Sequence, residues 1–224
     1  MSLAVNGAVK GSLVTAMRVA LKTMRVSRPG KARAWAHVLA AGAAGAAGGA
    51  FGLSALALEL PVTTTIILRS VADIARSEGE DLRQVSTRLA CLEVFAFGGR
   101  STADNASESG YFAVRAAIAQ AVTDAARYMA QKTVVEEGAP VIVRLLTQIA
   151  ARFNTVVAEK IVVQGVPVIG ALGGATVNML FMDHFQDMAR GHFVIRRLEG
   201  TYGVDTVQAA YAEVLAEEPP TSIE

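Results

Sequence analysis

Hydrophobic and polar residues follow one another along this chain with the period of an α-helix. In residues 3–26 the apolar Leu13, Met17 and Leu21 recur every four positions, and lysines and arginines occupy other positions. This pattern predicts a basic amphipathic helix. The turn sequence SRPG at 27–30 ends that helix.

The same spacing predicts further helices over residues 61–77, 81–97, 109–135, 141–163 and 204–216. We expect the first of these to begin at Pro61, because proline has no amide proton and fits the first turn of a helix. The β-branched clusters are short and lie within helical periodicity, so no strand pattern competes.

Two long stretches, Val38–Leu58 and Ile161–Met182, contain no charged residue. The first has about the 20 residues needed to span a bilayer. Its glycines form two GxxxG pairs, Gly45/Gly49 and Gly48/Gly52. This spacing places a flat strip on one helix face, where another helix backbone can approach closely. Glycine and alanine offer little lipophilic surface, so a helix packed within the protein is the alternative to a membrane span.

The second stretch contains Pro167, which predicts a break near Gly165 and a new helix that runs to about Arg197. The fold class we expect is all-α, a compact multi-helix bundle with two Gly/Ala-rich close-packing hydrophobic helices. We expect residues 1–30 to form the basic N-terminal helix, residues 31–216 the helical domain and residues 217–224 a disordered tail. The GxxxG faces also allow a helix-mediated homo-oligomer or a membrane-protein partner.

Composition and charge add a membrane-related context. Hydrophobic residues make up 52% of the chain, charged residues 18%, and the mean hydropathy is +0.38. Seven cations and no acidic residue precede Glu59, whereas five acidic residues and no cation follow Gly200. A basic start favours an anionic membrane surface. The alternative is two solvated ends of opposite sign that attract each other.

These features predict a cytoplasmic protein that associates peripherally with a membrane. A single cysteine, Cys91, excludes an internal disulfide and fits a reducing compartment. Nucleic-acid binding is not expected, since the basic segment has one aromatic residue, Trp35, and no recognised module follows it. We expect no cofactor.

Glu59 is the sharpest candidate for a functional residue, because it follows 21 uncharged residues and precedes a proline. A buried carboxylate there needs a partner or a raised pKa. It could serve a ligand cavity or proton site, or form a structural ion pair or cap. The cations considered as its partner are Arg69, Arg115, Arg196 and Arg197.

The second charge-free stretch contributes Asn178, whose amide must find hydrogen bonds. It is expected either to bind the backbone of residues 61–65 or to line a cavity. Arg115 follows aromatic residues, and Glu93 is the carboxylate we expect to pair with it. The complete set of candidate ligand-binding residues is Glu59, Arg69, Arg115, Asn178, His192 and Arg197.

No metal site is predicted, although Asp183, His184 and Asp187 are weak candidates together with His192. His184 and Asp187 share a helix face, but they supply two ligands and no closed site. Cys91 lies in an apolar helix and is expected to be inert packing. The sequence contains no G-x-S-x-G, HExxH or Walker A motif.

Several segments resemble the EcsC family of bacterial proteins. The matching stretches are GGAFGLSALALELPVTTTIILRSVADIARSEGEDL (48–82), CLEVFAFGG (91–99), SGYFAVRAA (109–117) and VPVIGALGGATVNMLFMDHFQDMARGHFVIRRLE (166–199). The resemblance covers most of the chain after about residue 38. It implies a membrane-related context, because the family is named for a protein encoded beside an ABC transporter linked to secretion. It implies no mechanism.

Three functions therefore stay open. The first is a non-enzymatic, membrane-associated helical accessory protein of EcsC type, linked to transport or secretion. The second is a soluble helical protein that binds a lipid-like or other apolar ligand between the Gly-rich helices. The third is a hydrolase that uses Glu59 or the Asp183/His184 pair. The sequence favours a non-enzymatic role.

Overall fold

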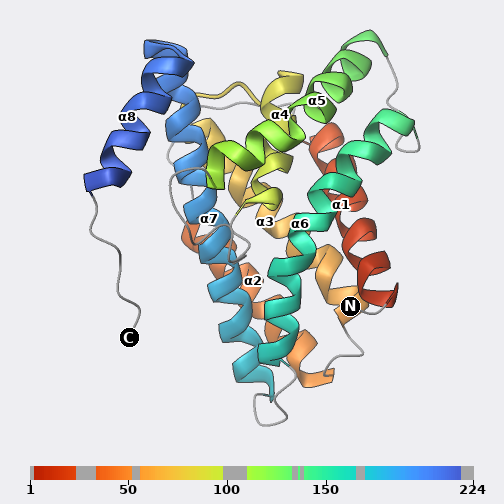
Figure 1. The fold of residues 1–224 in the computed structure, drawn as a ribbon. Coiled ribbons are helices and arrows are strands. Elements are labelled where there is room, and N and C mark those ends of the chain that lie inside the picture. The colour runs from red at the N-terminus through yellow and green to blue at the C-terminus, as the bar shows by residue number, and fades with distance from the viewer. Residues whose placement is uncertain are drawn as a thin grey trace.

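The computed structural model describes residues 3–23, 34–51, 56–97, 110–132, 136, 139–164 and 170–217. The described part contains eight α-helices, one short 3-10 helix and no strand. The helices are α1 (Leu3–Thr23), α2 (Ala34–Phe51), α3 (Leu56–Ser77), α4 (Val85–Glu93), α5 (Gly110–Gln131), α6 (Pro140–Gln164), α7 (Gly170–Tyr202) and α8 (Val204–Glu217), with the 3-10 helix η2 (Val94–Ala96) after α4. The expected all-α fold is confirmed (Figure 1).

The start of α3 corrects one prediction. The helix begins at Leu56 and continues through Pro61, which we had placed at its first turn. An amide at Pro61 would bond to the carbonyl of Ala57, so the proline removes only one hydrogen bond near the helix start. The Pro61 carbonyl accepts a hydrogen bond from the Thr65 hydroxyl at 2.8 Å, which supports the helix there.

The helix predicted over 81–97 is shorter, because a turn separates it from α3. Gly79 ends α3 in the left-handed conformation, with φ at +95°, which glycine adopts without strain. The chain then turns through residues 80–84, and α4 begins at Val85. This turn brings Glu80 close to α4 and to the distant helix α7.

The Gly-rich helices α2 and α7 pack against each other as an antiparallel pair. Ala34 of α2 is bonded to Gln186 of α7, and Ala41 to Asn178. The sums of these paired residue numbers stay nearly constant, as an antiparallel register requires. The expected packing of the two Gly/Ala-rich elements is therefore confirmed, and α3 lies against both helices (Figure 1).

The core lies between α1, α3, α4, α6 and α7. Its centre is a cluster of phenylalanine rings, in which Phe95 stands 5.2 Å from Phe153 and 5.3 Å from Phe185 between ring centroids. Apolar residues of α1 are buried in the same core, including Leu13 and Met17. Over residues 9–17, the apolar face of the N-terminal helix is therefore covered by protein.

The described parts of the charge-free stretches come together at one end of the bundle. Helices α2 and α6 end there, and α3 and α7 begin there, at the lower end in Figure 1. At the opposite end, α7 leads into α8, which descends beside α7 and stands apart from the bundle (Figure 1). The long helix α7 thus connects the end of the bundle that holds the charge-free stretches to the end that carries α8.

Candidate functional site

Two amide side chains of α7 join three helices in the lower part of the molecule. Asn178 is fully buried, and its Nδ2 donates to the carbonyl of Ala41 at 3.1 Å and to the hydroxyl of Thr63 at 3.3 Å. The residue thereby binds within the 61–65 segment, through a side chain rather than the expected backbone. We call this contact the Asn178 bridge.

Gln186 makes a second bridge of the same kind. Its Nε2 donates to the carbonyl of Ala34 at 3.0 Å and to the hydroxyl of Ser70 at 2.9 Å. The two carbonyls are seven residues apart on α2, and the two hydroxyls are seven residues apart on α3. The contact therefore repeats after two helical turns. Sequence reasoning missed Gln186, although its distance of two turns from Asn178 was a usable signal.

Between the bridges and the lower end, α2 and α7 approach each other at glycine. A Cβ atom at Gly45 would overlap the carbonyl oxygen of Gly174 and lie 2.7 Å from the Cβ of Asn178. At Gly42 it would lie 3.1 Å from the Cγ of Met179. The helices are already in contact here, so these glycines leave no space for an apolar ligand between them.

Glu59 and the cations considered as its partners are not gathered into one site. Glu59 is buried, and Arg69 is exposed on α3. The other three cations form ion pairs with different carboxylates: Arg115 with Glu199, Arg196 with Glu80 and Arg197 with Glu78. The set of candidate residues is therefore divided between separate places on α3, α5 and α7.

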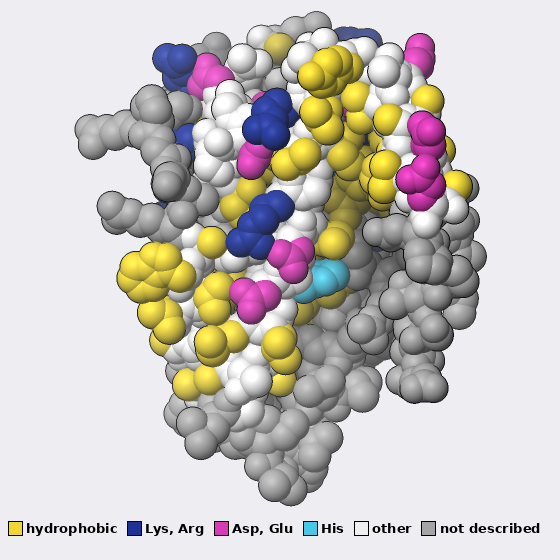
Figure 2. All heavy atoms as spheres, turned by 90° about the vertical axis from the view of Figure 1, so that its left-hand side faces the viewer, with side chains coloured by type: hydrophobic (Ala, Val, Ile, Leu, Met, Phe, Trp, Pro, Cys, Tyr) yellow, Lys and Arg dark blue, Asp and Glu magenta, His cyan; other side chains and the backbone are white. Residues whose placement is uncertain are grey.

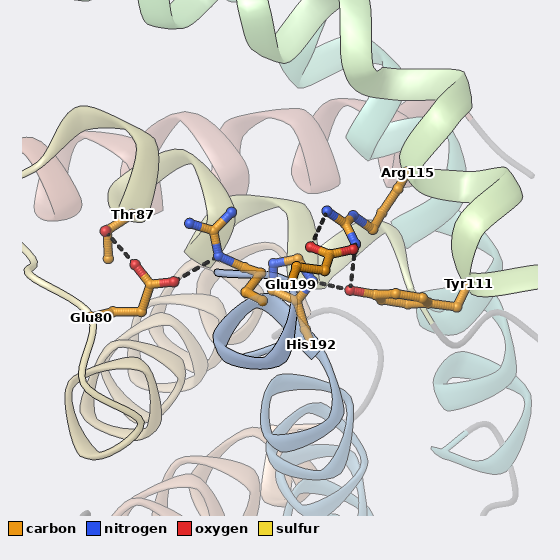
Figure 3. A network of polar contacts seen from close by, with 7 residues as sticks. Glu80, Thr87, Tyr111, Arg115, His192 and Glu199 are labelled. Atoms are coloured by element: carbon orange, nitrogen blue, oxygen red, sulfur yellow. Dashed lines mark hydrogen bonds and ion pairs between the residues drawn. The ribbon is translucent and has the colours of Figure 1, made fainter. Parts of the chain in front are cut away.

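The upper part of α7 carries a network of buried and partly buried polar side chains (Figure 3). Arg115 of α5 forms two hydrogen bonds to Glu199, of 2.7 and 3.0 Å. Its expected pairing with Glu93 is wrong, because the carboxylate that faces the guanidinium comes from α7, 84 residues away. Arg115 also donates to the Tyr111 hydroxyl at 3.4 Å and lies 5.4 Å from the centre of that ring.

His192 joins this network through Tyr111 and is buried. Its side chain is 1% exposed, and Nδ1 lies 2.8 Å from the Tyr111 hydroxyl. Burial, followed by the charges of Arg196 and Arg115, holds the pKa of His192 well below its ordinary value. Burial also raises the pKa of Tyr111. A neutral imidazole and a protonated phenol therefore share a hydrogen bond at Nδ1.

A second group of the network joins the turn after α3 to α4 and α7. Glu80 accepts hydrogen bonds of 2.7 Å from both Arg196 and Thr87. Burial alone would raise the pKa of Glu80, but the bonds from Arg196 and Thr87 outweigh it and hold the pKa below its ordinary value. Burial raises the pKa of Glu93, against the opposing charges of Arg196 and Arg115. Sequence reasoning missed Glu80, since its charged partner, Arg196, is 116 residues away.

The weak metal candidates do not converge. Asp183 is exposed, and Asp187 is bonded to Arg190 at 2.6 Å, with His184 half-buried beside them. In the described ranges, no three His, Cys, Asp or Glu side chains lie close enough to hold a metal ion. Cys91 is fully buried, and burial raises the pKa of its thiol.

Hydrophobic side chains are exposed where α2 and α7 run together. Trp35 is 69% exposed, Leu39 57% and Leu180 64%. The antiparallel register places Leu39 and Leu180 at the same level of the helix pair. Figure 2 shows hydrophobic side chains below the charged ones that run down the middle of this side of the molecule, and further hydrophobic ones beside and above them. We call the surface around these three residues the α2–α7 face.

One stretch within the described residues, Pro140–Ala158 of α6, is long and apolar enough to cross a membrane. Its buried side chains include Leu145, Ile149 and Phe153, which belong to the core. A buried core helix of a helical bundle has the same length and apolar composition, so this stretch is weak evidence for a membrane span.

The comparisons with known proteins give one match. A protein-family model described as the EcsC protein family matches residues 16–198. No curated protein and no solved structure matches the chain. The matched region begins within α1 and ends near the end of α7, so it contains both amide bridges and most of the polar network, and α8 lies beyond it.

Proposed function

The chain belongs to the EcsC protein family, and we propose on that premise that it is a non-enzymatic accessory protein that attaches to a membrane. The lower end of the bundle and the α2–α7 face would enter one leaflet, and the upper end would stay in water. Such a placement suits an accessory role beside a transport or secretion system.

The observation that carries this proposal is the charge-free surface of α2 and α7. No charged residue occurs between residues 38 and 58 or between residues 161 and 182, and the described parts of both stretches meet at one end. Leu39 and Leu180 are exposed on that surface. Moving a leucine side chain from water into an apolar medium is worth about 1.5–3 kcal/mol.

Trp35 supports the same orientation. It lies near the border of the charge-free surface, two residues before His37, and is largely exposed. Tryptophan side chains favour the boundary between hydrocarbon and water, because the indole has an apolar body and one polar N–H group. Its position therefore fits the headgroup level of a leaflet.

The basic helix α1 would contribute charge alone. Lys10 and Arg18 are exposed, whereas Leu13 and Met17 are buried in the core. Each cation near an anionic leaflet adds about 1 kcal/mol of attraction, which salt screens. The apolar contact of the α2–α7 face does not depend on salt, so the two contributions can be separated.

The burial of the side chains most suited to catalysis favours a non-enzymatic role. His192 and Cys91 are buried, and Glu59 is only 8% exposed. A general base or nucleophile must come within hydrogen-bond reach of its substrate. Binding of an apolar ligand between the Gly-rich helices is also disfavoured, because α2 and α7 are in contact at Gly45.

The test uses vesicles of mixed phosphatidylcholine and phosphatidylglycerol and the intrinsic fluorescence of Trp35, the single tryptophan. We expect a blue shift on addition of vesicles, quenching by brominated lipid, and co-sedimentation that survives high salt in part. The double variant Leu39→Glu/Leu180→Glu should reduce the bound fraction at least several-fold.

Val143→Glu is the matched control, because Val143 is also exposed but lies far from the α2–α7 face. It stands near the start of α6, whereas the end of α6 lies at the lower end of the bundle. It should bind vesicles like the unmodified protein. An unshifted Trp35 spectrum, with equal sedimentation of all three proteins, would contradict membrane insertion of the α2–α7 face.

A further inference from the structure

An apolar groove lies between α7 and α8, at the opposite end of the molecule from the charge-free surface. Its volume is about 340 Å³. The residues that line it are Ile195, Leu198, Tyr202, Thr206, Val207, Ala210, Tyr211 and Val214. Figure 2 shows hydrophobic side chains along a hollow on this side of the molecule. The groove is elongated along two helices, and this shape suits a third helix better than a compact solute.

The geometry of α8 explains why the groove is open. Gly203, with φ at +86°, ends α7 and turns the chain into α8. Tyr211 then anchors α8 on α5, with its ring centre 5.2 Å from that of Phe112 and 6.3 Å from that of Tyr111. Val207 is buried, but Val214 remains 58% exposed. The apolar stripe of α8 is therefore only partly covered.

The edge of the groove is acidic. Glu213 and Glu217 follow Ala210 by three and seven residues, so helix periodicity places them on the same side of α8 as this groove residue. Both are exposed, and in the described ranges neither forms an ion pair. No lysine or arginine follows Gly200 to neutralise them.

We propose that the groove between α7 and α8 docks a basic amphipathic helix of a partner protein. Apolar side chains at positions i, i+4 and i+7 of that helix would fill the groove, and flanking lysines or arginines would face Glu213 and Glu217. An anionic leaflet is disfavoured because the acidic edge would repel it. A second α8 is disfavoured for the same reason, since it carries the same charges.

A second copy of α1 is also an unsuitable occupant, although it is basic. Its apolar residues Leu13 and Met17 are buried in its own core and cannot fill another groove. The wall formed by α8 lies beyond the region matched by the family model. The docking site therefore combines the family domain with a helix outside the match.

The experiment measures binding of a fluorescein-labelled amphipathic peptide of leucine and lysine to the full chain by fluorescence anisotropy. A scrambled peptide of the same composition, with no apolar face, is the peptide control. We expect saturable binding of the amphipathic peptide alone, weakened by salt. Glu213→Lys/Glu217→Lys should weaken binding at least tenfold, and Ala210→Phe, which fills the groove, should abolish it.

Asp205→Lys is the matched control, because Asp205 is an exposed acid on the other side of α8. It should change the dissociation constant less than twofold. Circular dichroism of each variant checks that α8 stays folded. The proposal is overturned by equal binding of both peptides, by unchanged affinity in the double variant, or by an equal loss in Asp205→Lys. Vesicle binding that Ala210→Phe abolishes would instead identify a membrane contact.

Discussion

The lower half of α7, residues 170–186, and its upper half, residues 187–202, belong to one helix but contact their neighbours by different chemistry. The lower half meets α2 through glycine and uses Asn178 and Gln186 as its polar contacts. The upper half holds His192, Arg196 and Glu199, each of which is bonded to another element.

The two halves of α7 differ in the contacts that hold the neighbouring helices in place. Two backbones in contact at Gly45 have no room to shift, and the amide bridges fix their register because each needs a carbonyl and a hydroxyl at the correct height. The upper half has no such contact. Its neighbours are held by ion pairs and hydrogen bonds whose partners are far apart in sequence, and these bonds depend on pH.

The largest expected effect comes from breaking the glycine contact. Gly45→Val would place side-chain atoms against the carbonyl of Gly174, which is backbone and cannot move aside. We expect a loss in the free energy of unfolding at or above about 3 kcal/mol, the upper end of usual overpacking costs. Chemical denaturation measures it.

Gly191→Ala, in the upper half of α7, is the matched control for this change. A Cβ atom there meets nothing within 4 Å, so the variant should gain about 0.5–1 kcal/mol through helix propensity. A similar loss in both variants would show that the contact at Gly45 is not special.

The next largest effect should follow from breaking the strongest ion pair of the upper half. Arg115→Met leaves the Glu199 carboxylate, which is 9% exposed, without its two hydrogen bonds. We expect a loss of about 2–3 kcal/mol, less than for a fully buried pair because Arg115 is 23% exposed. The further change Glu199→Gln should restore part of it, as a double-mutant cycle would show. Additive losses would argue against the pair.

A smaller loss is expected from the lower half when one bridge is removed. Asn178→Leu leaves the carbonyl of Ala41 and the hydroxyl of Thr63 without this donor. The expected cost is about 2 kcal/mol. The exposed neighbour Leu180 supplies the control, since Leu180→Asn should change the free energy of unfolding by less than about 0.5 kcal/mol. Equal effects at both positions would contradict the bridge.

The smallest effect concerns how stability falls in acid, which should depend on the upper half of α7 and not on its lower half. His192 has a lowered pKa in the folded protein, so the unfolded chain binds the proton more readily. Stability is therefore present above the ordinary pKa of 6.5 and is lost as the pH falls below it, by up to about 1.4 kcal/mol per unit. His192→Phe should reduce the fall in melting temperature between neutral and mildly acidic buffer. Asn178→Leu should leave that fall unchanged, and an unaltered acid response in His192→Phe would exclude this linkage.

Much of the fold could be predicted from the sequence, because helical periodicity and uncharged glycine stretches are local signals. The pairing of α2 with α7 follows from two close-packing elements that each need a neighbour. The start of α3 was predicted at Pro61, but the helix begins at Leu56 and continues through the proline. A proline near a helix start removes only one hydrogen bond, so it does not have to begin the helix. The turn at Gly79 likewise shortened the helix that leucine spacing had predicted from residue 81.

The polar network could not be predicted in the same way. Arg115 and Glu199 are 84 residues apart, and Glu80 and Arg196 are 116 apart. Nothing in the sequence distinguishes these carboxylates from Glu93, which lies nearer to Arg115 along the chain. A charge pair of this kind is decided by the packing of α4, α5 and α7, which periodicity leaves open. Gln186 was overlooked because it stands just outside the charge-free stretch.

The continuity of α7 has a mechanical consequence. Its 33 residues form one rod of about 50 Å, with the α2–α7 face beside its lower half and the docking groove near its upper end. A rod of this kind transmits tilt: if the lower end changes its angle in a leaflet, the groove turns by the same angle. If both proposals hold, the angle at which the α2–α7 face enters the membrane also sets the direction in which the groove holds its partner.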